Sequence, residues 1–266
     1  TDVTQGLTID NNGIADVSWR GMDLYRVGNS TITNNRITPG QGREAGGYIR
    51  HEGIWLQNSG DNTISGNTLS LQDTVLTSQG VDIHGILMYS DYGNTIITSN
   101  DIQLVHGTAI AYYIAEAKTR GIGITGNTIR APVGISFPAS SEFGSYFDYD
   151  TPTIDNNEVY IIDGRGTNFG SPQGMYLQGL NSTSSLAQVE GNLFFIETSA
   201  SNVRGIVLGS SENTSVTGNT IRYTAGTGSA VSPSEGILVQ QGLRVFVTGN
   251  TFEKTWLFVS GFQAGI

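Results

Sequence analysis

The sequence contains no cysteine, and charged residues make up only 14% of its 266 positions. Without cysteine there is no disulfide framework, no thiolate nucleophile and no cysteine-based zinc site. Only 13 residues are basic against 23 acidic ones, so the formal net charge is -10 at pH 7. Nucleic-acid binding needs clusters of Lys and Arg, which the sequence lacks, so we expect no nucleic-acid partner.

Long apolar runs and helical signals are scarce as well. No segment approaches the roughly 20 apolar residues that span a bilayer, so we expect no membrane insertion. The first ten residues, TDVTQGLTID, lack the basic segment and apolar run of a targeting peptide, which was either removed or never part of this chain. Glycine accounts for 36 residues, and each costs about 1 kcal/mol in a helix. The composition therefore predicts little or no α-helix.

The sequence does contain a repeated phrase. A pattern close to T-I-x-x-N-x-I recurs, for example as TIDNNGI at 8–14, TITNNRI at 31–37 and GITGNTI at 123–129. Its asparagine recurs every 23 to 35 residues, at Asn12, Asn35, Asn67, Asn100, Asn127, Asn157, Asn192, Asn219 and Asn250. A second phrase, Gly-apolar-x-apolar, alternates with the first, as in GIWL at 53–56 and GILM at 85–88. Each repeat thus holds two or three short strands.

Short strands repeated at variable spacing are typical of a solenoid whose coils stack about 4.8 Å apart. We predict an all-β protein, a right-handed single-stranded parallel β-helix of about nine coils, with residues 1–266 forming one domain. Apolar residues of equivalent strands should pile into interior ladders, one of them formed by Ile32, Ile64, Ile96, Ile124, Ile154, Val189, Val216 and Val247. We interpret the asparagine column as structural, because Asn tolerates the left-handed conformation at bends and stacked Asn side chains can hydrogen-bond between coils.

These repeats resemble those of the parallel β-helix superfamily, which includes pectate-lyase-like enzymes, alginate lyases and C5-epimerases, polygalacturonases and phage tailspike depolymerases. The resemblance covers almost the entire chain and rests on scaffold residues. The Asp-Pro-His-Asp-type motif of mannuronan epimerases and the paired-aspartate motif of polygalacturonases are absent. The resemblance implies a polysaccharide partner and an extracellular location, secreted or on a virion surface.

The two ends of the sequence lack obvious caps. A solenoid must cover its terminal coils, because exposed strand edges invite pairing. The sequence starts just before Val3 and stops in the apolar segment WLFVSGFQAGI at 256–266. We therefore expect either that it belongs to a longer chain or that other chains cover its ends, as in a homotrimeric tailspike.

The residue before each repeated glycine defines an outward column, because the interior of a β-helix is filled with side chains. This column begins with Arg20 in the first coil, and Glu52, His84 and His106 follow one another in coils two to four. Two residues earlier on the same face, Arg50 should face Asp82 across one coil step. We predict that Glu52, Asp82, His84 and His106 are the catalytic residues of one patch.

Aromatic and polar side chains flank this patch. A sugar-binding surface needs aromatic faces for the apolar sides of pyranose rings and polar groups for their hydroxyls. An extension of the fourth coil at 111–120 adds further residues of both kinds. The predicted substrate-binding residues are Asp23, Tyr25, Arg50, Trp55, Tyr89, Tyr112 and Lys118.

The first functional hypothesis is a polysaccharide-degrading glycoside hydrolase that resembles a tailspike depolymerase. Glu52 would be the general acid, and Asp82 the base or the nucleophile. Carboxylates one or two coils apart match the separations of retaining enzymes, about 5–5.5 Å, and inverting enzymes, about 6.5–9.5 Å.

Two alternatives stay open. In a uronate-specific lyase or C5-epimerase, His84 or Tyr89 would abstract the C5 proton, and Arg50 or Lys118 would neutralise the uronate carboxylate. In a non-catalytic glycan-binding or structural module of a phage tail or cell surface, the same groove would bind a glycan without any acid/base pair.

No cofactor is expected. Calcium would be the accessory ion, bound by Asp10, Asn11 and Asn12 or by the Asp148 to Asp150 loop, because it prefers carboxylate and amide oxygens. A zinc-type site made of Glu52, His84 and His106 is conceivable from the ligand types, but stacking makes convergence on one ion awkward. We therefore assign no metal site.

Overall fold

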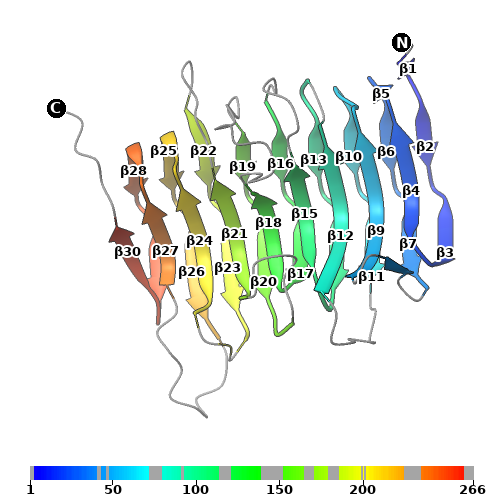
Figure 1. The fold of residues 1–266 in the computed structure, drawn as a ribbon. Coiled ribbons are helices and arrows are strands. Elements are labelled where there is room, and N and C mark those ends of the chain that lie inside the picture. Colours follow the sequence, from blue (N-terminus) through cyan, green and yellow to red (C-terminus); the bar gives the residue numbers. More distant parts are fainter. Residues whose placement is uncertain are drawn as a thin grey trace.

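The chain forms a stack of short strands that climbs in one direction. The structure is a computed structural model, and it describes residues 3–40, 43–45, 48–71, 80–90, 93–113, 121–138, 152–164, 171–178, 186–198, 200, 202–224 and 235–260. Successive coils lie side by side in chain order, from the blue end to the red end of Figure 1. Three long sheets run along the stack, and each takes one strand from each successive coil. This is the predicted all-β parallel β-helix.

The three sheets follow one another within each coil. The first sheet contains β2 (Thr8–Asp10), β6 (Thr31–Thr33), β10 (Thr63–Ser65), β13 (Ile96–Thr98), β16 (Gly123–Thr125), β19 (Thr153–Asp155), β22 (Ala187–Glu190), β25 (Glu212–Thr217) and β28 (Leu243–Thr248). The second sheet contains β3 (Gly13–Val17), β7 (Arg36–Pro39), β11 (Thr68–Leu71), β14 (Asp101–Leu104), β17 (Thr128–Ala131), β20 (Glu158–Ile161), β23 (Leu193–Ile196), β26 (Thr220–Tyr223) and β29 (Thr251–Glu253).

The third sheet carries the glycine phrase and the predicted site. It contains β4 (Arg20–Tyr25), β9 (Tyr48–Gln57), β12 (Gly80–Tyr89), β15 (Thr108–Tyr113), β18 (Val133–Phe137), β21 (Gln173–Gln178), β24 (Arg204–Gly209), β27 (Glu235–Gln240) and β30 (Trp256–Ser260), and the antiparallel β8 (Arg43–Ala45) pairs with β9. Two short strands, β1 (Thr4–Gln5) and β5 (Val27–Gly28), form a separate pair. No helix long and apolar enough for a membrane crossing occurs in the described part of the chain.

Apolar side chains from all three sheets fill the interior. In the first sheet Ile32, Ile64 and Ile124 belong to one fully buried ladder, as predicted. The prediction of Ile96 for this ladder was wrong, because Ile97 pairs with Ile64 while Ile96 is 43% exposed. Like the other ladder residues, Ile97 lies three positions before the asparagine of its phrase, whereas Ile96 lies four before it.

The asparagine column is a hydrogen-bonded ladder, which confirms its structural role. The Asn100 side chain donates to Oδ1 of Asn127 at 2.9 Å, and Asn127 in turn donates to Oδ1 of Asn157 at 2.9 Å. The left-handed conformation, however, belongs to the residue before each ladder asparagine, such as Asn34 with φ 55° and Gly66 with φ 63°. Bending and stacking are therefore divided between two consecutive residues.

Candidate functional site

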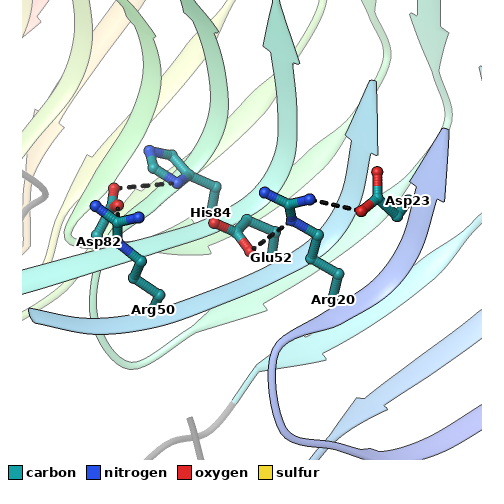
Figure 2. A network of polar contacts seen from close by, with 6 residues as sticks. All are labelled: Arg20, Asp23, Arg50, Glu52, Asp82 and His84. Atoms are coloured by element: carbon teal, nitrogen blue, oxygen red, sulfur yellow. Dashed lines mark hydrogen bonds and ion pairs between the residues drawn. The ribbon is translucent and has the colours of Figure 1, made fainter. Parts of the chain in front are cut away.

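The outward column before the repeated glycine is formed as predicted in the first three coils. Strands β4, β9 and β12 place Arg20, Glu52 and His84 next to one another in register. Figure 2 shows the Glu52 carboxylate between the His84 side chain and the Arg20 guanidinium. Glu52 and His84 are each only 1% exposed, although they face away from the solenoid core.

A second polar row lies two residues before this column. Arg50 Nε is 3.1 Å from Asp82 Oδ2, which confirms the predicted pairing across one coil step. The other Asp82 oxygen lies 3.8 Å from His84 Nδ1. Asp82 therefore lies between a guanidinium and an imidazole (Figure 2).

Arg20 joins Glu52 to the aromatic residues of the face. Its Nε is 3.5 Å from Glu52 Oε2, and its Nη1 is 2.5 Å from Asp23 Oδ2. Its Cζ atom lies 3.4 Å from the centre of the Trp55 ring and 4.6 Å from that of Trp19. Arg20 precedes the first repeated glycine and so belongs to the same column, but it was not among the predicted site residues.

Burial shifts the pKa values of the two central groups in opposite directions. It raises the pKa of Glu52 to about 7, because a buried carboxylate loses hydration, and the charge of Asp82 adds to this effect while Arg20 opposes it. Burial lowers the pKa of His84 to about 4 against the opposing effect of Asp82. At neutral pH the imidazole is therefore uncharged and Glu52 is close to half protonated, a combination typical of functional sites.

The predicted aromatic flank is present. The rings of Trp55 and Tyr89 lie on adjacent coils with centroids 6.4 Å apart, tilted by 35°. Tyr25 shares the ladder of Tyr89 through Gln57, and it is 51% exposed. These rings offer apolar faces next to the polar rows, as a sugar-binding surface requires.

The fold and its repeats agree with a known family. Residues 2–166 match the family described as the right handed beta helix region. The chain belongs to this family. No curated protein and no solved structure matches it. The match confirms the predicted right-handed β-helix and assigns no function to any residue.

One predicted binding residue of this β-helix was assigned to the wrong face. Tyr112 is fully buried in the core and packs edge-to-face on Phe137, with ring centroids 5.6 Å apart. Its neighbour Tyr113 pairs with Tyr89 in register and takes the outward place. The Tyr113 hydroxyl lies 3.4 Å from His84 Nε2, and the two rings meet edge-to-face. Successive side chains of a strand point to opposite faces. Because Tyr113 is paired with the outward Tyr89, Tyr113 faces outward and Tyr112 faces the core.

The prediction that His106 stacks on His84 was also wrong. In register, the residue opposite His84 is Thr108, and His106 lies in the turn before β15. The cause is an additional glycine in this coil. Gly107 has φ 92° and forms the turn, while Ala109 takes the position that glycine holds in the neighbouring coils. The zinc-type alternative fails with this register, and the described residues contain no group of three or more metal-binding side chains of this kind.

The remaining predictions concern Lys118 and the two suggested calcium clusters. Lys118 and the Asp148 to Asp150 loop lie outside the described residues. In the other suggested calcium cluster, Asp10 Oδ1 accepts hydrogen bonds from Thr33 and Asn34, which hold the pKa of Asp10 below its usual value. Asn12 donates to Asn35 as the first member of the asparagine ladder. The side chains of Asp10 and Asn12 are therefore already hydrogen-bonded to residues of the next coil.

Proposed function

We propose that this β-helix protein binds a polysaccharide on the outer face of its third sheet and hydrolyses a glycosidic bond there. The observation that carries this proposal is the raised pKa of Glu52 beside the ion-paired carboxylate of Asp82. A general acid must keep its proton near the working pH, whereas its partner carboxylate must be charged. Glu52 is then the general acid and Asp82 the base or nucleophile.

The neighbouring residues support this division of roles. Arg50 Nε lies 3.1 Å from Asp82 Oδ2 and forms an ion pair with this carboxylate. His84 is buried and uncharged at neutral pH, and its Nε2 lies 3.4 Å from the hydroxyl of the partly exposed Tyr113. Tyr113 is therefore the member of this pair that we expect to hydrogen-bond a sugar hydroxyl. Because Glu52 is 1% exposed and contacts Arg20, we expect substrate binding to displace Arg20 from this pair.

Product analysis tests the proposal. The protein is incubated with neutral, uronic and capsular polysaccharides, and reducing ends and unsaturated products are followed. We expect reducing ends that are lost in Glu52→Gln and in Asp82→Asn and are retained in Glu212→Gln, a carboxylate of the first sheet. Activity should fall as the pH rises above about 7, because Glu52 must be protonated to act as the acid. Full activity in Glu52→Gln would refute the proposed roles.

The burial of Glu52 and His84 favours a second candidate function, a non-catalytic glycan-binding module. Such a module would use the exposed aromatic residues, such as Tyr25, and would need no proton transfer. It predicts glycan binding without any product and unchanged binding by Glu52→Gln. Unsaturated products would instead indicate the lyase alternative.

The proposal also includes a location and an assembly. A polysaccharide-degrading β-helix of this kind acts outside the cell, either secreted or on a virion surface. In the tailspike case it is a homotrimer, so light scattering should give three times the 28.3 kDa of the chain.

A further inference from the structure

Arg20 contacts two carboxylates of the candidate site, and it contacts them unequally. Its Nη1 donates a hydrogen bond of 2.5 Å to Oδ2 of Asp23, whereas its Nε lies 3.5 Å from Oε2 of Glu52. In the described part of the chain, neither Arg20 Nε nor Glu52 Oε2 has a hydrogen-bond partner, although both atoms are buried. Figure 2 shows the guanidinium between the two acids. The closer contact of Arg20 is therefore with Asp23.

The two acids differ in their access to solvent. The side chain of Asp23 is 51% exposed, while Glu52 is only 1% exposed. A buried carboxylate needs a cation beside it to be charged, whereas an exposed one is stabilised by water. The position of the Arg20 guanidinium therefore matters more for the charge of Glu52 than for that of Asp23.

Charged and titratable groups from three strands surround Glu52. Arg20 comes from β4, Asp82 and His84 come from β12, and Arg50 comes from β9, the strand of Glu52 itself. Burial raises the pKa of Glu52 most and the charge of Asp82 adds to it, whereas Arg20 and, more weakly, Arg50 lower this pKa. Of the two guanidinium groups, Arg20 thus has the larger effect on the proton of Glu52.

We infer that Asp23 is a positioning residue that holds the Arg20 guanidinium away from a full hydrogen bond with Glu52, so that Glu52 keeps the proton it needs as a general acid. The inference rests on the proposed function and concerns the regulation of the same site. In this role Asp23 acts through Arg20, which differs from the substrate-binding role predicted from the sequence.

Trp55 limits where the guanidinium can go. Arg20 Cζ lies 3.4 Å from the centre of the Trp55 ring, a distance at which a guanidinium is attracted to the ring face. When Asp23 no longer holds Arg20, sliding along this face brings the guanidinium closer to Glu52.

The titration of Glu52 tests the inference. Its side-chain carboxyl is followed by carbon NMR of isotope-labelled protein, and the signal is assigned by its absence in Glu52→Gln. From a midpoint of about 7 in the unmodified protein, the midpoint should fall by about one pH unit in Asp23→Asn and rise by about one in Arg20→Met. Asp23→Glu keeps the carboxylate and should titrate like the unmodified protein. An unchanged midpoint in Asp23→Asn would overturn the inference.

A double variant separates the route through Arg20 from a direct effect of the Asp23 charge. If Asp23 acts through Arg20, Asp23→Asn should hardly move the Glu52 midpoint in the Arg20→Met background. An equal fall in both backgrounds would show a direct effect and contradict the inference. Arg20→Gln replaces Arg20→Met if the latter does not fold. Glu253→Gln is the matched control, because it removes a partly exposed acid paired with Arg222 on the second sheet, and it should leave the midpoint unchanged.

Kinetics give a second readout and separate this inference from the proposed function. Asp23→Asn should move the alkaline limb of the pH profile of kcat to lower pH and leave KM nearly unchanged. A higher KM with an unmoved pH profile would indicate substrate binding by Asp23 and refute the positioning role. If no polysaccharide is cleaved, the proposed function fails while the NMR titrations still decide the inference. If products form and the midpoint does not respond to Asp23→Asn, the inference alone fails.

Discussion

Glu52 and His84 show how one environment acts on two kinds of titratable group. Both are 1% exposed and lie on adjacent coils, and burial favours the neutral form of each. The pKa of Glu52 is therefore raised to about 7, and the pKa of His84 is lowered to about 4. As a result, a site with three acidic and two guanidinium side chains can change its charge near neutral pH through Glu52.

The raised pKa of Glu52 makes stability depend on pH. Because it lies above the ordinary value of 4.5, its contribution to stability is full below about pH 4.5 and is lost as the pH rises through 7. In Glu52→Gln this loss is absent, so the variant should gain stability relative to the unmodified protein between pH 5 and 8, by up to about 3 kcal/mol.

Thermal unfolding at pH 5 and pH 8 measures this difference. The lowered pKa of His84 acts in the opposite sense, since its contribution is present above 6.5 and is lost as the pH falls through about 4. His84 is present in both proteins, so the comparison isolates Glu52. Parallel pH profiles would show that Glu52 does not titrate in this range.

At the scale of the strand, the repeated glycine brings the third sheet close to the second. A Cβ added at Gly205 would lie 2.5 Å from the Gly236 carbonyl oxygen and 2.9 Å from Ile221 Cγ2. Because a backbone oxygen cannot move aside cheaply, Gly205→Ala should lower the free energy of unfolding by about 1–3 kcal/mol. Denaturation by urea measures the loss.

Gly13 provides the matched control for this prediction. A Cβ added at Gly13, in β3, meets no atom within 4 Å. Gly13→Ala should therefore be neutral or stabilise the protein by about 0.4–1 kcal/mol, through the lower entropy of the unfolded chain. Similar urea midpoints for Gly205→Ala and Gly13→Ala would contradict the role of the repeated glycine.

At the scale of the molecule, the asparagine ladder couples coils along the solenoid. Oδ1 of Asn127 accepts from both the backbone and the side chain of Asn100, while its Nδ2 donates to the Ile97 carbonyl and to Asn157. Asn127→Ala leaves several buried groups unpaired, so we expect it to cost about 3 kcal/mol or more. The melting temperature reports this loss.

Asn12, the first member of the ladder, tests whether the loss of stability comes from hydrogen bonds between coils. Asn12 is exposed and donates to Asn35 without accepting from an earlier coil in the described chain. Asn12→Ala should therefore cost only about 1 kcal/mol. An equal loss in both variants would show that the local turn, and not the ladder, explains the effect.

The sequence alone determined the parallel β-helix, its interior ladders and the central part of the candidate site. Equivalent positions of stacked parallel coils become neighbours, so a repeated phrase predicts contacts between residues far apart in the chain. For this reason the pairing of Arg50 with Asp82 and the contact of Glu52 with His84 could be predicted from spacing alone. Both lie in coils whose glycines align without an insertion.

Only the tertiary structure decided the details that depend on register and burial. Gly107 forms a turn and shifts the fourth coil, so Thr108 takes the place predicted for His106. Neighbouring residues of a strand point to opposite faces, so Tyr113 faces the site whereas Tyr112 is buried in the core. The pKa of Glu52 depends on burial by segments distant in the chain, and no local pattern in the sequence carries that information.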